Sequence, residues 1–151
     1  TGDVAGVASS DVSRVLVNDV FFGTYTAKLD AKNRLIIPSE LYQVLEYRVA
    51  TKDLFIRRNS KNGFAGLFCF SAIPPQEQTP SELFFSYFRK CGLDAQRRLL
   101  LTREELEYSK LLPIKKKTGV LVTGAGDYFC IWNRLVFEAY EKKCRGLKKD
   151  S

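Results

Sequence analysis

The chain has 151 residues, of which 45% are hydrophobic and 13% aromatic, so it can form one compact domain or two very small ones. Its formal net charge of +7 favours a polyanionic partner, although excess charge can also simply keep a protein soluble. There is no histidine and no CxxC pair, which argues against a zinc site and removes the commonest general base. We therefore expect no enzyme, no metal, no cofactor and no small-molecule substrate.

Residues 1–19 differ in charge from the rest of the chain. They contain one basic residue, Arg14, against three aspartates, so their net charge is −2 and that of the remainder is +9. This composition makes a poor signal peptide. No apolar run approaches the roughly 18 residues that a membrane-spanning helix needs. We expect a flexible N-terminal extension, no membrane partner and a cytoplasmic location.

Residues 20–73 form the first of two units. Residues 20–28 and 34–37 are rich in β-branched and aromatic side chains, which predicts two strands. Between them, Asp30-Ala31-Lys32-Asn33 predicts a type I turn followed by a left-handed residue, because Asp suits the first position and Asn33 tolerates positive φ. Pro38 favours a helix start just beyond the second strand. Residues 54–58 and 66–71 supply two more strands.

A Pro-rich linker, residues 74–86, leads to the second unit, residues 87–134. Residues 83–88 are ambiguous, because their apolar spacing is helical whereas alignment with residues 22–29 predicts a strand from Tyr87 onward. We give the repeat more weight than the spacing and expect the strand. Thr102 and Glu105 form a T-x-x-E capping box that predicts a helix through about Lys110. Further strands are expected at residues 120–123 and 128–132.

Residues 135–151 are expected to form a C-terminal helix, capped by Asn133, and a basic tail. Lys115, Lys116 and Lys117 predict an exposed loop. Cys69 and Cys130 are expected to be small buried hydrophobic residues. The aromatic side chains of the strands favour a core position over a platform for single-stranded nucleic acid; they are Phe68, Phe70, Phe129 and Trp132.

The chain repeats itself. Residues 29–37 read LDAKNRLII and residues 93–101 read LDAQRRLLL, an offset of 64. A second correspondence follows in the same order, between residues 68–70 (FCF) and residues 129–131 (FCI). Two matched blocks at nearly the same spacing indicate two versions of one unit of roughly 50 residues.

Residues 21–41, FFGTYTAKLDAKNRLIIPSEL, resemble the start of the MraZ family, and LDAQRRLLLTREEL with VLVTGAGDYFCIWN resembles its second repeat. The likeness runs from about Val20 to Tyr140. It implies a mainly β protein with short helices (α+β), in which two AbrB-like swapped-hairpin halves form a double-ψ-like β-barrel within one chain. It also implies homo-oligomeric rings and regulation of a division and cell-wall gene cluster.

The repeated turns are the candidate DNA-binding site. A two-stranded ribbon can enter the major groove, where Arg34 and Arg98 can fork onto guanine O6 and N7. Neighbouring basic side chains can meet phosphates. The candidate DNA-binding residues are Lys28, Lys32, Arg34, Arg97 and Arg98. Three further residues are expected to cap the turns and orient the following arginine; they are Asp30, Asn33 and Asp94.

The position before the motif arginine is usually Gly in the family but is Asn33 and Arg97 here. Holding an Arg at positive φ costs roughly 1–2 kcal/mol, which leaves open whether the second turn keeps the shape of the first.

The leading hypothesis is a sequence-specific, nucleoid-associated transcriptional regulator that binds repeated operator sites in double-stranded DNA through basic hairpin tips. The alternatives are an oligomeric ring scaffold whose basic tips bind acidic partners, and an RNA-binding module. A sequence preference in duplex binding that falls steeply with salt would separate the first hypothesis from the other two.

Overall fold

Strands dominate the part of the chain that the structure, a computed structural model, describes: residues 19–48, 53–112 and 119–149. The expected mainly β protein with a few short helices is confirmed. In chain order the elements are β1 (Thr24–Ala27), β2 (Arg34–Ile36), α2 (Ser39–Arg48), β3 (Asp53–Lys61), β4 (Phe64–Phe70), α3 (Ser81–Phe84), the 3-10 turn η1 (Phe85–Tyr87), β5 (Phe88–Gly92), β6 (Arg98–Leu100), α4 (Arg103–Tyr108), β7 (Val120–Gly124), β8 (Tyr128–Asn133) and α5 (Arg134–Lys149).

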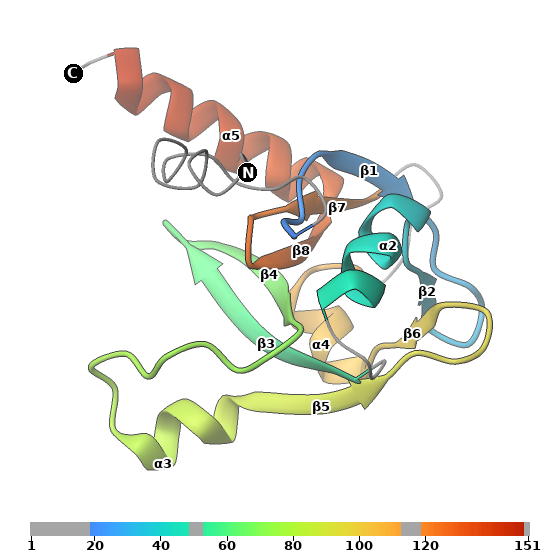
Figure 1. Cartoon of the computed structure of the whole chain (residues 1–151). Helices are drawn as coiled ribbons and strands as arrows, with labels where there is room; N and C mark the ends of the chain where they lie inside the picture. The colour runs from blue at the N-terminus through green and yellow to red at the C-terminus, as the bar shows by residue number, and fades with distance from the viewer. Residues whose placement is uncertain (1–18, 49–52, 113–118, 150–151) are drawn as a thin grey trace, which may run out of the picture.

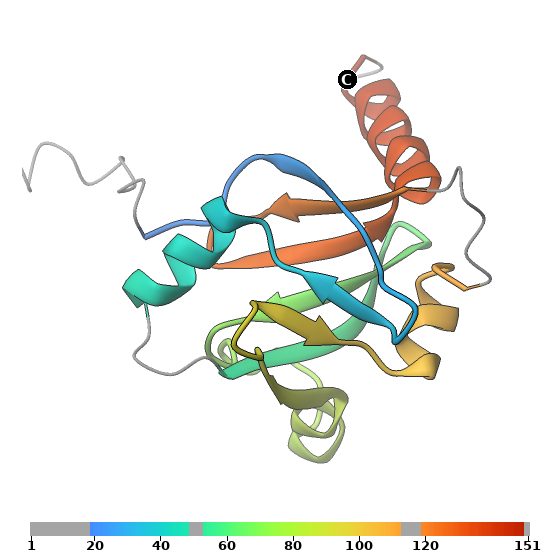
Figure 2. The same cartoon turned by 90° about the vertical axis from the view of Figure 1, so that its right-hand side faces the viewer.

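Six strands form one antiparallel sheet in the order β1-β7-β8-β4-β3-β5, and β2 pairs with β6 in a separate two-stranded ribbon (Figure 1). The edge strands β1 and β5 do not pair with each other, so this sheet is not closed. The double-ψ barrel expected from the family resemblance is therefore not confirmed. The ribbon lies across one face of the open sheet (Figure 2).

The main core fills the space between the sheet and the ribbon. Leu35 of β2 and Leu99 of β6 are fully buried there, together with the inward residues of the sheet. Alternation along each strand sends every second residue to this face. In β4, for example, Leu67 and Cys69 enter this core, whereas Phe68 points to the opposite face. The helices α2 and α4 close the sides of this core.

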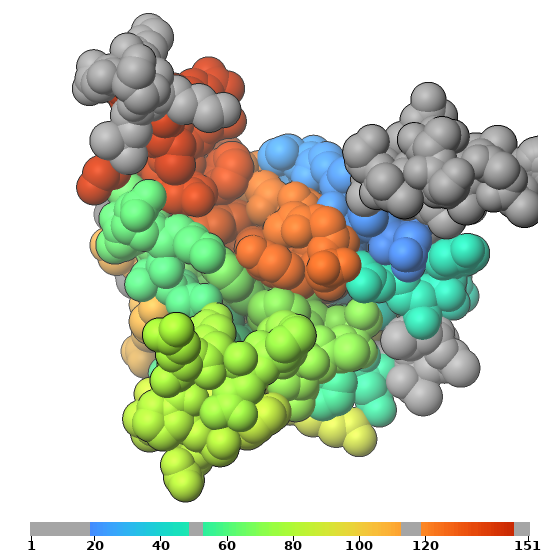
Figure 3. Space-filling model, turned by 60° about the vertical axis from the view of Figure 1, so that its left-hand side comes forward, coloured from blue at the N-terminus to red at the C-terminus, as the bar shows by residue number. Residues whose placement is uncertain are grey.

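The opposite face of the sheet carries an aromatic second core. Phe68, Phe70 and Trp132 are buried in it, and α5 packs Phe137 and Tyr140 against Trp132. Figure 3 shows this side, with α5 in red beside the β3–β4 hairpin in green. The expected core position of the strand aromatic residues is confirmed, as is the burial of Cys69 and Cys130.

The first strand is shorter than the sequence indicated. Residues 20–28 were expected to be one strand, but Gly23 adopts a φ of +93° and only β1 is regular. The chain before this bend turns so that Phe21 pairs with Gly126 through two backbone hydrogen bonds of 2.8 Å. Gly124 permits this crossing, because a Cβ there would lie 2.2 Å from the backbone nitrogen of Phe22.

The ambiguous stretch at residues 83–88 contains both structures in succession. The helix α3 and the turn η1 occupy the end of the expected linker, and β5 begins at Phe88. The helical spacing of apolar residues agrees with α3, because Phe84 is fully buried at the end of this helix. Pairing with β3 then imposes the extended backbone of β5.

Both predicted helix caps are confirmed. The hydroxyl of Thr102 accepts the backbone N–H of Glu105, while the Glu105 carboxylate accepts the backbone N–H of Thr102. The side chain of Asn133 accepts the backbone N–H groups of residues 135 and 136. Two helix ends differ from expectation: α4 ends at Tyr108, and α5 runs to Lys149, so the basic tail is helical through that residue. Residues 1–18 and 115–117, to which expectations were attached, lie outside the described residues.

Candidate nucleic-acid interface

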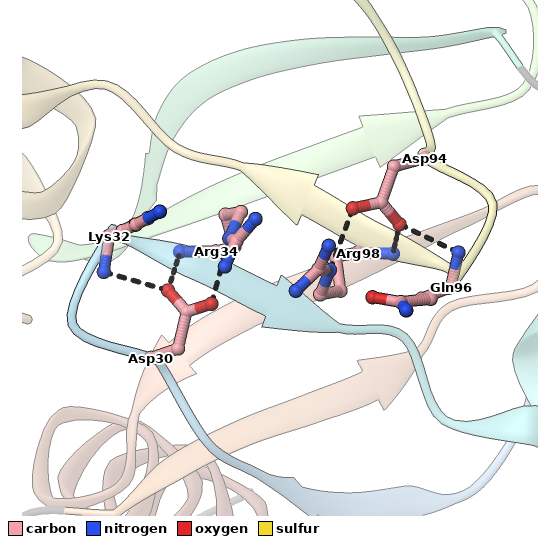
Figure 4. Close-up of polar contacts among 6 residues, drawn as sticks. All are labelled: Asp30, Lys32, Arg34, Asp94, Gln96 and Arg98. Carbon is pink, nitrogen blue, oxygen red and sulfur yellow. Dashed lines mark hydrogen bonds and ion pairs between the residues drawn. The ribbon is translucent and has the colours of Figure 1, made fainter.

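The first repeated turn is organised around one carboxylate. Oδ1 of Asp30 accepts the backbone N–H groups of Lys32 and Arg34, both at 2.9 Å. Its Oδ2 accepts the side-chain Nε–H of Arg34 at 2.8 Å (Figure 4). A single Asp thus satisfies two donors of the turn and binds the guanidinium of the residue that resumes the strand.

The second turn has the same geometry. Asp94 Oδ1 accepts the backbone N–H groups of Gln96 and Arg98 at 2.9 and 2.8 Å, and its Oδ2 accepts Arg98 Nε–H at 2.7 Å. Arg97 has a φ of 62°, almost the value of 63° at Asn33 in the first turn. The question left open by the sequence is therefore resolved. Arg97 keeps the left-handed conformation, because the hydrogen bonds of Asp94 offset a cost of roughly 1–2 kcal/mol.

The two turns lie at opposite ends of the ribbon that β2 and β6 form. Leu35 pairs with Leu99 at its centre. The backbone N–H of Ile37 donates to the carbonyl of Arg97, and the N–H of residue 101 donates to the carbonyl of Asn33, both at 3.0 Å. Positions 64 residues apart therefore make the same bonds with the strands exchanged, so an approximate twofold relates the two turns.

The ribbon presents Arg34 and Arg98 together on its outer face, opposite the buried Leu35 and Leu99 (Figure 4). Their side chains are only 28% and 25% exposed, because each lies against its aspartate. Each Nε is occupied by that carboxylate. The outer edge of each guanidinium retains the two Nη groups that form a forked donor pair.

The remaining candidate cations surround this pair. Lys28 and Lys32 are exposed, and neither has an ion-pair partner among the described residues. Arg97 is half-buried, with its guanidinium 5.6 Å from the ring centroid of Tyr42. Lys28 and Arg97 line one groove of about 400 Å³ beside β2. The fold thus gathers all five candidate DNA-binding residues around one ribbon.

The environment of the two aspartates keeps them ionised. The pKa of Asp30 is lowered, above all by the backbone N–H of Arg34, with further lowering from the Arg34 guanidinium against an opposing effect of desolvation. The pKa of Asp94 is lowered in the same way by the backbone N–H and guanidinium of Arg98. Both turns therefore keep their ion pairs at neutral pH.

A partly buried ion pair that the sequence did not predict anchors the ribbon to the sheet. Nε and Nη2 of Arg89 donate to the two carboxylate oxygens of Glu105 at 2.8 and 2.7 Å. Nη2 also donates to the carbonyl of Leu100 in β6 at 3.1 Å. The capping box identified Glu105, but only the fold brings Arg89 of β5 beside it.

Two outward-facing aliphatic residues of the ribbon were also missed. Ile36 and Leu100 are 51% and 57% exposed. The signal was present in the sequence, because strict alternation about the apolar Leu35 and Leu99 sends both of them outward. Among the described residues, no three potential metal ligands gather in one place, and no helix is both long and apolar enough to cross a membrane.

Comparison with known proteins identifies the family of this chain. No protein-family model matches the chain. A transcriptional regulator MraZ of Desulfitobacterium hafniense is 30% identical over 131 residues, covering 82% of this chain and 88% of that protein. The transcriptional regulator MraZ of Syntrophobacter fumaroxidans is 30% identical over 152 residues, covering 87% and 88%. That of Mycolicibacterium gilvum is 26% identical, covering 82% and 88%. The chain belongs to the MraZ family.

Proposed function

We propose that this protein is a sequence-specific DNA-binding transcriptional regulator whose β2–β6 ribbon enters the major groove. The observation that carries the proposal is the pair of arginines, Arg34 and Arg98, held on one exposed face by matched aspartates at 2.8 and 2.7 Å. Relatives named transcriptional regulators support it. The proposal gives the chain no catalytic role and places it in the cytoplasm, on the nucleoid.

The two kinds of cation in the site have different roles, because Arg34 and Arg98 contact bases and the lysines contact phosphates. The Nη groups of Arg34 and Arg98 donate to O6 and N7 of guanine, while Asp30 and Asp94 restrict the rotation of each guanidinium. Side chains held in this way lose little conformational freedom on binding. Lys28 and Lys32 meet phosphates, and Arg97 joins them from beside Tyr42.

The wider parts of the proposal follow from the family resemblance. The protein assembles into a homo-oligomeric ring and regulates a division and cell-wall gene cluster through repeated operator sites. In such a ring several ribbons engage one DNA molecule, so a modest loss at each ribbon multiplies across the assembly.

The test begins with the selection of bound duplexes from a random DNA pool. Binding of the selected duplex and of a scrambled one is then titrated at several salt concentrations. Arg34→Ala is expected to lose roughly 1–3 kcal/mol per engaged ribbon and to flatten discrimination at a guanine position. Lys32→Ala is expected to weaken binding to both duplexes alike and to lower the salt slope by about one for each phosphate that is no longer neutralised.

Arg145→Ala is the matched control, because it removes one exposed cation from α5, which lies away from the ribbon (Figure 1). It is expected to retain both affinity and sequence preference. If Arg34→Ala also retains both, the ribbon does not recognise bases. Equal or tighter binding of single-stranded RNA would favour the RNA-binding alternative instead.

A further inference from the structure

The outer face of the β2–β6 ribbon combines two cations with two aliphatic side chains. Arg34 pairs across the ribbon with Leu100, and Ile36 pairs with Arg98. Each arginine therefore has an exposed aliphatic residue directly opposite in the register, with Cβ atoms at the roughly 4.5–5.5 Å separation of cross-strand pairs. The two aliphatic residues occupy equivalent positions, because they are 64 residues apart like the turns themselves.

The exposure of this pair is not explained by the core. Ile36 and Leu100 are 51% and 57% exposed, whereas Leu35 and Leu99 between them are fully buried. Neither residue belongs to the two core clusters or packs at their edges, within the residues that the structure describes. A single exposed aliphatic residue is ordinary, but two placed symmetrically in the centre of a candidate binding face indicate a contact.

The surroundings of the pair specify the partner. Lys28, Arg97 and Ile36 border the same groove, and Arg34 and Arg98 flank the aliphatic side chains. The partner must therefore be anionic at its edges and carry small apolar groups within reach of the ribbon. Double-stranded DNA meets both conditions, since each thymine projects a C5-methyl group into the major groove between two phosphate backbones.

We propose that Ile36 and Leu100 contact thymine methyl groups and so determine part of the DNA sequence that this ribbon recognises. The inference rests on the proposed function and names the base that accompanies guanine in the site. Ile36 and Leu100 are diagonal neighbours in the antiparallel pair, which places them about 7–8 Å apart. That separation matches about two base-pair steps of 3.4 Å each.

The same contact discriminates DNA from RNA. Uracil lacks the C5-methyl group, and the major groove of an RNA duplex is too deep and narrow for side chains to reach its bases. An aliphatic pair at the centre of the face therefore selects DNA without any contact to the sugar.

The experiment compares the selected duplex with an otherwise identical duplex in which deoxyuridine replaces every thymine. This change removes only the methyl groups. The wild-type protein is expected to bind the deoxyuridine duplex about fourfold more weakly for each methyl contact, the change that follows from about 0.8 kcal/mol per buried methyl-sized group. The variant with Ile36→Ser and Leu100→Ser is expected to bind both duplexes equally. A scrambled duplex with the same replacement measures its effect on non-specific binding.

Leu135→Ser is the matched control, because Leu135 is equally exposed, at 56%, but lies on α5. It is expected to retain the wild-type preference for thymine, and thermal unfolding verifies that each variant is folded. Three results overturn the inference while leaving DNA recognition intact: equal wild-type binding to both duplexes, a selected site without thymine, or an undiminished thymine preference in the double variant. Light scattering that shows loss of oligomers in the double variant also overturns it, in favour of a subunit contact. Absence of any sequence preference in wild-type binding would instead contradict the proposed function.

Discussion

The ion pair between the partly exposed Arg89 and the buried Glu105 gives the sharpest prediction for stability. Glu105 is 5% exposed, and its two oxygens accept hydrogen bonds of 2.8 and 2.7 Å from Arg89. Removing one partner of a fully buried pair costs about 3–5 kcal/mol, because the other charge is then buried without a partner. Arg89 is one-third exposed, so water compensates part of the loss. We therefore expect Glu105→Gln to lower the free energy of unfolding by about 3 kcal/mol.

Glu105→Gln is chosen because the amide oxygen still accepts the backbone N–H of Thr102, so the helix cap survives. Urea denaturation of this variant, of Arg89→Met and of the double variant forms a double-mutant cycle. The double variant is expected to lose about 2 kcal/mol less than the sum of the single losses. The control Glu107→Gln breaks an exposed pair of 3.5 Å with Arg103 and is expected to cost under about 1 kcal/mol. A loss below about 1 kcal/mol for Glu105→Gln, or additive single losses, would refute the reasoning.

Two further predictions concern the backbone crossing and acid stability. Gly124→Ala places a Cβ 2.2 Å from the Phe22 nitrogen, so the crossing chain must move and the melting temperature is expected to fall by many degrees. Gly126→Ala has open space around the new Cβ at a φ of +87° and is expected to cost only about 1–2 kcal/mol of backbone strain. Calorimetry that shows equal falls in melting temperature for the two variants would contradict this prediction. Asp30 and Asp94 have folded pKa values below the ordinary value near about 4, so their stabilising contribution is complete above that value and is lost as the pH falls through the lowered folded pKa. Asp30→Asn is therefore expected to flatten the dependence of stability on pH below about pH 4, and an unchanged acid titration of unfolding would count against the turn geometry.

Local sequence was sufficient for features that short-range physics controls. The capping box at Thr102 and the Asn133 cap are confirmed because their hydrogen bonds close within a few residues of the capping side chain. Residue type likewise predicted the burial of Trp132 and Cys69, because aromatic side chains and free cysteines favour core positions. The repeat at an offset of 64 identified the two turns, and their hydrogen bonds match.

Contacts between distant segments had to come from the tertiary structure. The first strand is shortened because the backbone of residues 21 and 22 crosses close over Gly124. Regular strand pairing with β7 therefore begins only after this crossing. Propensity could not choose between helix and strand at residues 83–88, since burial of Phe84 and pairing of β5 with β3 act on successive parts of that stretch. The sequence also did not predict the open sheet with its separate ribbon, because the order of strands depends on which strands pair over long distances in the chain.

The candidate site likewise has a part that local sequence predicts and a part that only the tertiary structure decides. Sequence alone named Arg34 and Arg98 with their aspartates, because D-x-x-x-R fits within one turn and its ion pair closes locally. Only the pairing of β2 with β6 brings the two turns onto one ribbon, exposes Ile36 and Leu100 beside them, and seats Arg89 against Glu105. These contacts join segments at least 16 residues apart, so local propensity does not predict them. The free energy that stabilises them comes from burial of the shared core.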